Sequence, residues 1–210
     1  MRLRRVLTAH FLLLIPLVLL SATESCATLY SSVSKYKNSR VQLQDIEKLK
    51  EYDHLIRYFA GICYFRPKHK VSPDFVRALI LAESGANSKA ISTKNALGLG
   101  QILYETGDRA AKELASSLTS FRYVSKRKLS NLKEEDLFDP AINILLTCYL
   151  VAKYNFKFEG RLDLVVSAWN AGEYTESLSR LSHAPYQETE DLIGKVNAYY
   201  VYLLRNRVFR

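Results

Sequence analysis

The chain has 210 residues, of which 48% are hydrophobic and 24% are charged, and its formal net charge is +9. This length allows one or at most two domains, and the ordinary apolar fraction argues against a disordered chain. The positive excess implies an anionic polymer or surface as a neighbour, or a solvated basic surface without a dedicated partner. No predicted helix carries a Lys/Arg stripe interleaved with aromatic residues, so nucleic acid is not the expected partner.

The first residues have the layout of an export signal. Three arginines within the first five residues precede an apolar run over residues 11–20, as in secretory signals. The run is shorter than the roughly 20 apolar residues of a membrane-spanning helix, although a retained anchor is an alternative. We therefore assign residues 1–26 to an export signal or membrane anchor and expect the protein outside the cytoplasm, where nucleic acid is absent.

The three cysteines leave alternatives open. Cys26 stands where a lipoprotein cysteine would, but Ser25 and Ala27 also fit an ordinary signal cleavage site. Cys63 and Cys148 can form a disulfide in an oxidising compartment or remain as buried free thiols. Their spacing excludes a zinc cluster.

Helical patterns follow this leader. Residues 27–40 are polar and predict a tether, and apolar residues then recur at helical spacing over 41–59. Ser72 can cap the next helix, Pro73 fits its first position, and Gly85 is expected to end it. Each of these signals is local.

The second half of the chain is also helical. Asp139 and Pro140 predict a helix to about Tyr154, and further helices are predicted over 162–170 and 189–204. No segment alternates like a strand, so one all-α domain over residues 41–210 is expected. Within it, residues 119–138 read as a basic surface insertion.

One acidic residue occupies an apolar helix face. Glu83 follows Val76, Leu79 and Ile80 at spacings of seven, four and three residues, which places all four on one stripe. Burial and the negative end of the helix dipole both predict a pKa above that of a free glutamate. A carboxyl that keeps its proton near neutral pH suits general acid catalysis. The alternative is a structural glutamate paired with Lys or Arg from another helix.

Three sequence strings then occur in series. Glu83 opens ESGANSKAISTKNALGLGQI, and LFDPAINI and SAWNAGEYT follow downstream. In this order they resemble the motifs of the lytic transglycosylases, an SLT-like family of the lysozyme-like superfamily. The resemblance is closest to the small, single-domain, membrane-associated members.

This resemblance implies a lysozyme-like helical domain with a glycan-binding groove, in the bacterial periplasm or cell envelope. It implies cleavage of the β-1,4 bond between N-acetylmuramic acid (MurNAc) and N-acetylglucosamine (GlcNAc) in peptidoglycan, with formation of 1,6-anhydroMurNAc. Peptidoglycan glycan strands are then the partner, membrane association arises through the N-terminus, and no metal or organic cofactor is needed. We expect a monomer.

Carried over by position, the resemblance makes Glu83 the catalytic acid and base. It assigns substrate-binding positions to six further residues: Ser84, Ser92, Gly98, Leu99, Gln101 and Asn170. Asn170 can instead be a helix cap. Trp169 replaces the usual tyrosine of the family and can belong to the core.

Other positions depart from the family pattern. Ser88 replaces proline and Gly100 replaces methionine, which changes one wall of the groove. In ETEDLIGKVNAYY, which resembles the terminal motif, Leu192 replaces a tyrosine that commonly hydrogen-bonds the glutamate. No second carboxylate stands on an apolar face, whereas ordinary glycosidases use two. A hydrolytic muramidase and a non-catalytic peptidoglycan-binding protein therefore remain as alternatives.

Overall fold

The computed structural model describes residues 29–209, so the predicted export signal or anchor lies outside the described residues. The described part is helical, with only isolated β-bridges among residues 91–102, which confirms the all-α prediction. The elements after a first helix at residues 29–36 are α2 (Leu43–Glu51), α3 (Asp53–Ala60), η1 (Pro67–His69), α4 (Pro73–Ser84), α5 (Tyr104–Ser116), α6 (Lys126–Ser130), η2 (Glu134–Phe138), α7 (Pro140–Lys157), α8 (Leu162–Ala171), α9 (Glu176–Ser179) and α10 (Gln187–Asn206).

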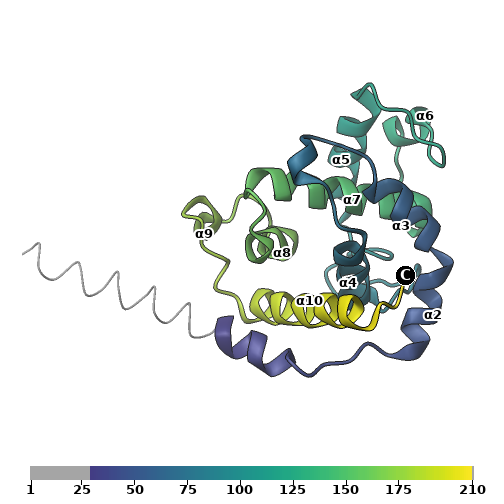
Figure 1. Ribbon diagram of the computed structural model, residues 1–210. Helices are drawn as coiled ribbons and strands as arrows, with labels where there is room; N and C mark the ends of the chain where they lie inside the picture. The colour runs from purple at the N-terminus through teal and green to yellow at the C-terminus, as the bar shows by residue number, and fades with distance from the viewer. Residues whose placement is uncertain (1–28, 210) are drawn as a thin grey trace, which may run out of the picture.

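The central helix α4 forms where the local signals predict it. Ser72 caps its first turn by accepting a hydrogen bond from the Phe75 amide, Pro73 begins the helix, and Gly85 ends it with a φ of 57°. Eight consecutive residues from Phe75 to Ala82 are buried. Figure 1 shows α4 in the middle of the molecule, with α10 along its lower side. The chain thus surrounds α4 with other helices, and α10 makes its most extensive contact.

α7 is the other long buried helix. The Asp139 carboxylate accepts hydrogen bonds from the amides of Ala141 and Ile142, and Pro140 occupies the first position. The helix continues to Lys157, three residues beyond the predicted end. α8 and α10 cover the predicted ranges with small extensions.

The structure differs from the expectation of one helix over residues 41–59. The helix breaks at Tyr52, which separates α2 from α3. The break changes the direction of the chain, so α3 packs against α4 and α7 whereas α2 contacts α4. An apolar spacing shared by two successive helices does not reveal such a break, because each helix satisfies it separately.

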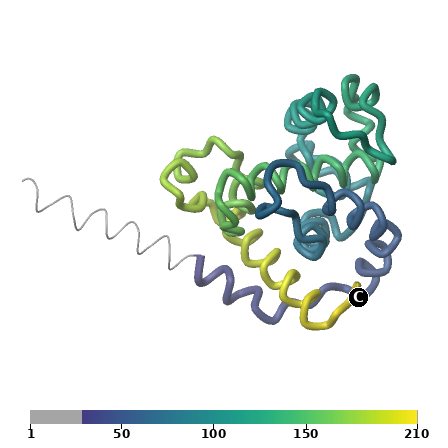
Figure 2. The backbone as a smooth tube through the Cα atoms, turned by 45° about the horizontal axis from the view of Figure 1, so that its top comes forward, coloured from purple at the N-terminus to yellow at the C-terminus, as the bar shows by residue number. Residues whose placement is uncertain are grey.

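Two further segments are better packed than predicted. Residues 29–36, part of the expected tether, form a helix beside the start of α10, as Figure 2 shows. Ser32 is buried there, and a Cβ at Gly194 would lie 2.6 Å from its carbonyl oxygen. Residues 119–138 form α6 and η2, and their Leu129 and Leu137 are fully buried. The sequence did not reveal this packing, because the few buried residues of the two segments stand among many polar surface residues.

No described helix is both long enough and apolar enough to cross a membrane. Cys63 and Cys148 are free thiols in the structure. Cys148 is buried as expected, whereas Cys63 is exposed, which corrects the expectation that both thiols are buried.

Candidate active site

The last turn of α4 carries Glu83 on the predicted apolar stripe. Val76, Leu79 and Ile80 are buried, and the Glu83 side chain is partly buried beside them. Burial raises the pKa of Glu83 to about 7, because the charged form loses hydration. The predicted direction of the shift is therefore confirmed.

Two groups from other helices partly offset this effect of burial on the pKa of Glu83. The strongest is a hydrogen bond from the Trp169 side chain of α8, in which the indole N–H is the donor. The second is the positive charge of Lys195 on α10, whose Nζ donates to the Ala82 carbonyl at 2.7 Å. Burial also lowers the pKa of Lys195. Both groups stabilise the carboxylate, although burial remains the larger effect.

Lys195 follows Leu192 by one helical turn on α10. Leu192 is partly buried and packs against the hydrophobic core. Because its side chain is a hydrocarbon, it supplies no hydroxyl to the carboxyl group of Glu83. Trp169 and Lys195 are the donor and the cation that interact with Glu83 in its place. The family departure at Leu192 therefore removes one possible partner of the carboxyl group while two others are present.

Trp169 and Gly100 also fit together sterically. A Cβ at Gly100 would lie 3.4 Å from Cζ2 of the indole and 2.3 Å from Thr147 Oγ1. A side chain at position 100 would therefore collide with α7 and crowd the indole. The absence of a side chain at Gly100 leaves the space beside Glu83 to Trp169.

A cleft of about 150 Å³ opens at Glu83. Four of the predicted site residues line it, together with six that the sequence did not single out as lining residues: Glu83, Ser92, Gln101 and Asn170, with Thr93, Lys94, Ala96, Leu103, Trp169 and Glu188. A smaller cavity of about 50 Å³ shares Gln101, Leu103 and Trp169 with the cleft. The shared residues make the two hollows neighbours on one surface.

The remaining predicted residues lie behind the cleft wall. The Ser84 hydroxyl donates to the Leu99 carbonyl at 2.7 Å, and Leu99 is fully buried. Gly98 has a φ of 71°, and a Cβ there would lie 2.3 Å from the Leu137 carbonyl. Its lack of a side chain therefore permits close packing against the η2 end, and its assignment as a substrate-binding position stays a prediction.

Asn143 of α7 holds this loop and was not singled out from the sequence. Its Oδ1 accepts a hydrogen bond from the Gly100 amide at 2.8 Å. Its Nδ2 donates to the carbonyls of Leu97 and Leu137 at 3.0 and 2.8 Å. The fully buried amide thereby satisfies three buried backbone groups and fixes residues 97–101 against α7.

Glu188 at the start of α10 places a second carboxylate in the cleft lining. Its Oε2 accepts from Lys94 Nζ at 2.6 Å, and its Oε1 accepts from Asn170 Nδ2 at 3.4 Å. The hydrogen bond from Lys94 lowers the pKa of Glu188, so this group is charged at neutral pH. Asn170 also accepts a hydrogen bond from the Thr189 hydroxyl at 2.6 Å. The two carboxyl groups of the cleft therefore differ in protonation.

Within residues 29–209, no group of three His, Cys, Asp or Glu side chains is arranged to hold a metal ion.

The chain is similar to a known protein family. The model of the family described as "Transglycosylase SLT domain" matches residues 65–183, more than half of the chain. The chain belongs to this family.

Individual relatives agree with this assignment. A Haemophilus influenzae protein assigned by name to the soluble lytic murein transglycosylases is 30% identical over 151 residues, which cover 65% of this chain and 23% of that protein. The 70 kDa soluble lytic transglycosylase of Escherichia coli matches with a TM-score of 0.56 and 21% identity, over 74% of this chain and 24% of its own. An inactive glutamate-to-glutamine variant of the Pseudomonas aeruginosa enzyme matches with a TM-score of 0.53 and 18% identity, over 77% and 25%.

This SLT transglycosylase chain spans about a quarter of the length of those relatives. At these identities the two solved structures support the fold. The matched family segment contains Glu83, the loop at residues 92–101 and α8, but it ends before α10. Lys195 and Glu188 therefore lie outside the matched segment. The expected kinship with small membrane-associated members stays a prediction.

Proposed function

We propose that this SLT-family chain is a peptidoglycan lytic transglycosylase that cleaves the MurNAc–GlcNAc β-1,4 bond and forms 1,6-anhydroMurNAc, with Glu83 as general acid and then general base. The observation that carries the proposal is the partly buried Glu83 carboxyl, with a pKa of about 7, in the lining of a cleft. A glutamate with the ordinary pKa of 4.5 would be protonated in only about 0.3% of molecules at pH 7. About half of the molecules carry the acid form here.

In the proposed reaction, the Glu83 proton moves to the glycosidic oxygen as the bond from that oxygen to C1 of MurNAc breaks. The N-acetyl group of the same sugar stabilises the positive C1. The Glu83 carboxylate then takes the proton from O6, and O6 bonds to C1 to close the anhydro ring. The proton balance closes on one residue, and no water is consumed.

The surroundings of Glu83 suit both halves of this cycle. Burial favours the acid form that begins the reaction, whereas the Trp169 hydrogen bond and the Lys195 charge stabilise the carboxylate formed midway. We propose that Ser92, Gln101 and Asn170 contact the glycan from the cleft lining. Ser84, Gly98 and Leu99 then act indirectly, by holding the loop.

Glu188 gives the hydrolytic alternative a specific basis. A hydrolytic muramidase needs a carboxylate that activates water, and Glu188 is charged and lines the same cleft. Its pairing with Lys94 and Asn170 favours a positioning role instead. Under the transglycosylase proposal, Glu188→Gln changes substrate binding and leaves the product chemistry as it is.

The test is product analysis after the full-length protein is incubated with purified peptidoglycan. Mass spectrometry is expected to show anhydromuropeptides, and Glu83→Gln should yield none. Products heavier by one water, lost in Glu188→Gln, would support the muramidase. Binding to peptidoglycan without any cleavage by the wild type would support the non-catalytic alternative.

We further propose that the protein acts outside the cytoplasm, on glycan strands in the periplasm or cell envelope. The predicted signal or anchor at residues 1–26 supports this location. Cell fractionation with an antibody against the protein tests it, and recovery only in the cytoplasmic fraction would contradict it.

A further inference from the structure

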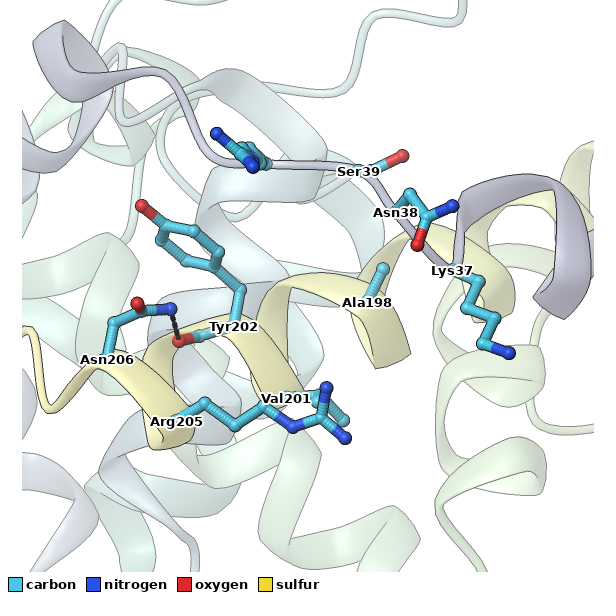
Figure 3. A pocket seen from close by; sticks show the side chains of 9 residues that line it. Lys37, Asn38, Ser39, Ala198, Val201, Tyr202, Arg205 and Asn206 are labelled. Carbon is cyan, nitrogen blue, oxygen red and sulfur yellow. Dashed lines mark hydrogen bonds between the residues drawn. The ribbon is translucent and has the colours of Figure 1, made fainter.

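A second cavity, of about 530 Å³, lies between residues 37–40 and the C-terminal half of α10 (Figure 3). It shares no lining residue with the cleft at Glu83. Arg205 in its lining follows Lys195 by ten residues on α10, which corresponds to about 15 Å along a helix. The cavity is therefore a separate feature that the proposed glycan chemistry leaves unused. We call it the basic pocket.

The charged groups of the basic pocket are all positive. Lys37, Arg40 and Arg205 line it, and no carboxylate does. Within residues 29–209, none of the three side chains forms an ion pair. Lys35, two residues before Lys37, does form an ion pair, with its Nζ 3.0 Å from Asp191 Oδ1.

Neutral polar side chains add to these cations. Asn38, Ser39, Tyr202 and Asn206 also line the basic pocket and carry hydrogen-bond donors. Asn206 Nδ2 uses one of its two hydrogens for the Tyr202 carbonyl at 2.8 Å (Figure 3). Figure 3 shows Lys37 on the loop and Arg205 on the helix, so the charges come from both walls. The pocket is thus rich in donors and has no anionic acceptor of its own.

The scaffold of the basic pocket is fixed by packing. The Ser39 amide donates to the Tyr36 carbonyl at 2.8 Å. Val41, directly after the pocket loop, is buried, and so is Ala198 on the facing helix. The backbones of the two walls are therefore fixed, while the side chains of Lys37, Arg40 and Arg205 are exposed and line the space between them. A bound anion would relieve the repulsion among these like charges.

We propose that the basic pocket binds a phosphate-bearing anion. Two guanidinium groups and an ammonium match the several acceptor oxygens of a phosphate, and the planar guanidinium binds two of them at once. A carboxylate has only two oxygens that can accept hydrogen bonds. Three cations and four neutral donor side chains offer more hydrogen bonds than those two oxygens can accept. The volume of about 530 Å³ leaves room for the groups esterified to a phosphate.

Two sources supply this chemistry, namely an anionic phospholipid headgroup and a soluble phosphate compound. The position in the chain favours the lipid. Residue 37 lies eleven residues after Cys26, and residues 29–36 between them are helical. The helix rises about 12 Å and the three residues before it span at most about 11 Å, so the reach is under about 25 Å. If the chain is anchored through residues 1–26, the basic pocket stays within that distance of the membrane surface.

The experiment uses full-length protein and vesicles of phosphatidylcholine, with or without about one third phosphatidylglycerol. The pocket variant carries Arg40→Gln and Arg205→Gln. The control variant carries Arg127→Gln and Lys133→Gln, which remove the same charge from the exposed region of α6 and the turn after it. Because all three proteins share the same N-terminus, its contribution to vesicle binding cancels in the comparison. In a second arm, inorganic phosphate is titrated against the amide NMR signals of residues 37–40.

We expect the pocket variant to bind the anionic vesicles at least tenfold more weakly than wild type and control, and to lose the phosphate-dependent NMR shifts. If phosphate shifts the amide NMR signals of residues 37–40 while all three proteins bind vesicles equally, the result would support a phosphate site in the basic pocket. It would assign that site to a soluble phosphate compound. Equal weakening in pocket and control variants, or no effect in either arm, would overturn the proposal. So would displacement of phosphate by soluble peptidoglycan fragments that carry only carboxylates. Peptidoglycan cleavage in solution should be the same in the pocket variant and wild type, which separates this proposal from the glycan chemistry.

Discussion

The two walls of the cleft are built in different ways. The helical wall, from α4 and α8, presents Glu83 and Trp169 directly from the hydrophobic core. The loop wall, residues 92–101, has no regular element and depends on polar contacts such as those of Asn143. The helical wall therefore sets the proton affinity of the acid, and the loop wall sets the shape of the space in front of it.

The largest effect is expected from Glu83→Gln in the helical wall. The variant keeps the shape of the side chain but has no transferable proton, so peptidoglycan cleavage should fall at least about 100-fold. Turbidity clearance by purified protein measures this loss. Retained activity within about tenfold of wild type would exclude Glu83 as the general acid.

The same variant has a predictable effect on stability. Because the folded-state pKa of Glu83, about 7, lies above the ordinary 4.5, the folded wild type binds more protons between these values and loses stability as pH rises through them. Glu83→Gln lacks this loss, on the order of 1–3 kcal/mol. Its melting temperature relative to wild type should therefore rise from pH 4.5 to pH 7.5. A constant difference would mean that burial does not shift this carboxyl.

The loop wall is tested by Asn143→Ala. The substitution leaves the Gly100 amide and the Leu97 and Leu137 carbonyls without their buried partner. We expect a loss of about 2–4 kcal/mol in the free energy of unfolding, measured by urea denaturation. Asn197→Ala, at an exposed position of α10, is the matched control and should change it by less than about 0.5 kcal/mol. Equal effects in the two variants would show that Asn143 does not support the loop.

The smallest effect is expected from Lys195→Met, which removes a charge that favours the Glu83 carboxylate. The pKa of Glu83 should rise, so the pH at which activity declines on the alkaline side should also rise. The ratio of activities at pH 8 and pH 6 should increase about twofold to fivefold. Lys195→Arg keeps the cation and should retain the wild-type pH profile. A shift to lower pH in Lys195→Met would contradict the proposed electrostatics.

The sequence predicts α4 and the place of Glu83 on it because these signals are local. Ser72, Pro73 and Gly85 bound α4, and the spacing of apolar residues places Glu83 on the buried stripe. Burial follows from that stripe, and the raised pKa follows from burial.

The rest of the site depends on contacts between distant segments. Trp169 and Lys195 reach Glu83 from positions 86 and 112 residues away, and no local pattern encodes that proximity. α5 was not predicted because its buried face consists largely of Gly107, Ala110 and Ala111, which give a weak apolar signal. A buried polar residue such as Asn143, four positions after the Asp139 cap, was the one available hint of the loop anchor.

Titration of the Glu83 carboxyl itself tests its role as the acid most closely. In protein labelled with ¹³C at glutamate side chains, the carboxyl signal absent from Glu83→Gln identifies this residue. The burial of Glu83 predicts that this chemical shift titrates with a midpoint of about 7. A midpoint near 4.5 would show a carboxylate that is fully charged at neutral pH, and would contradict the role of Glu83 as the acid.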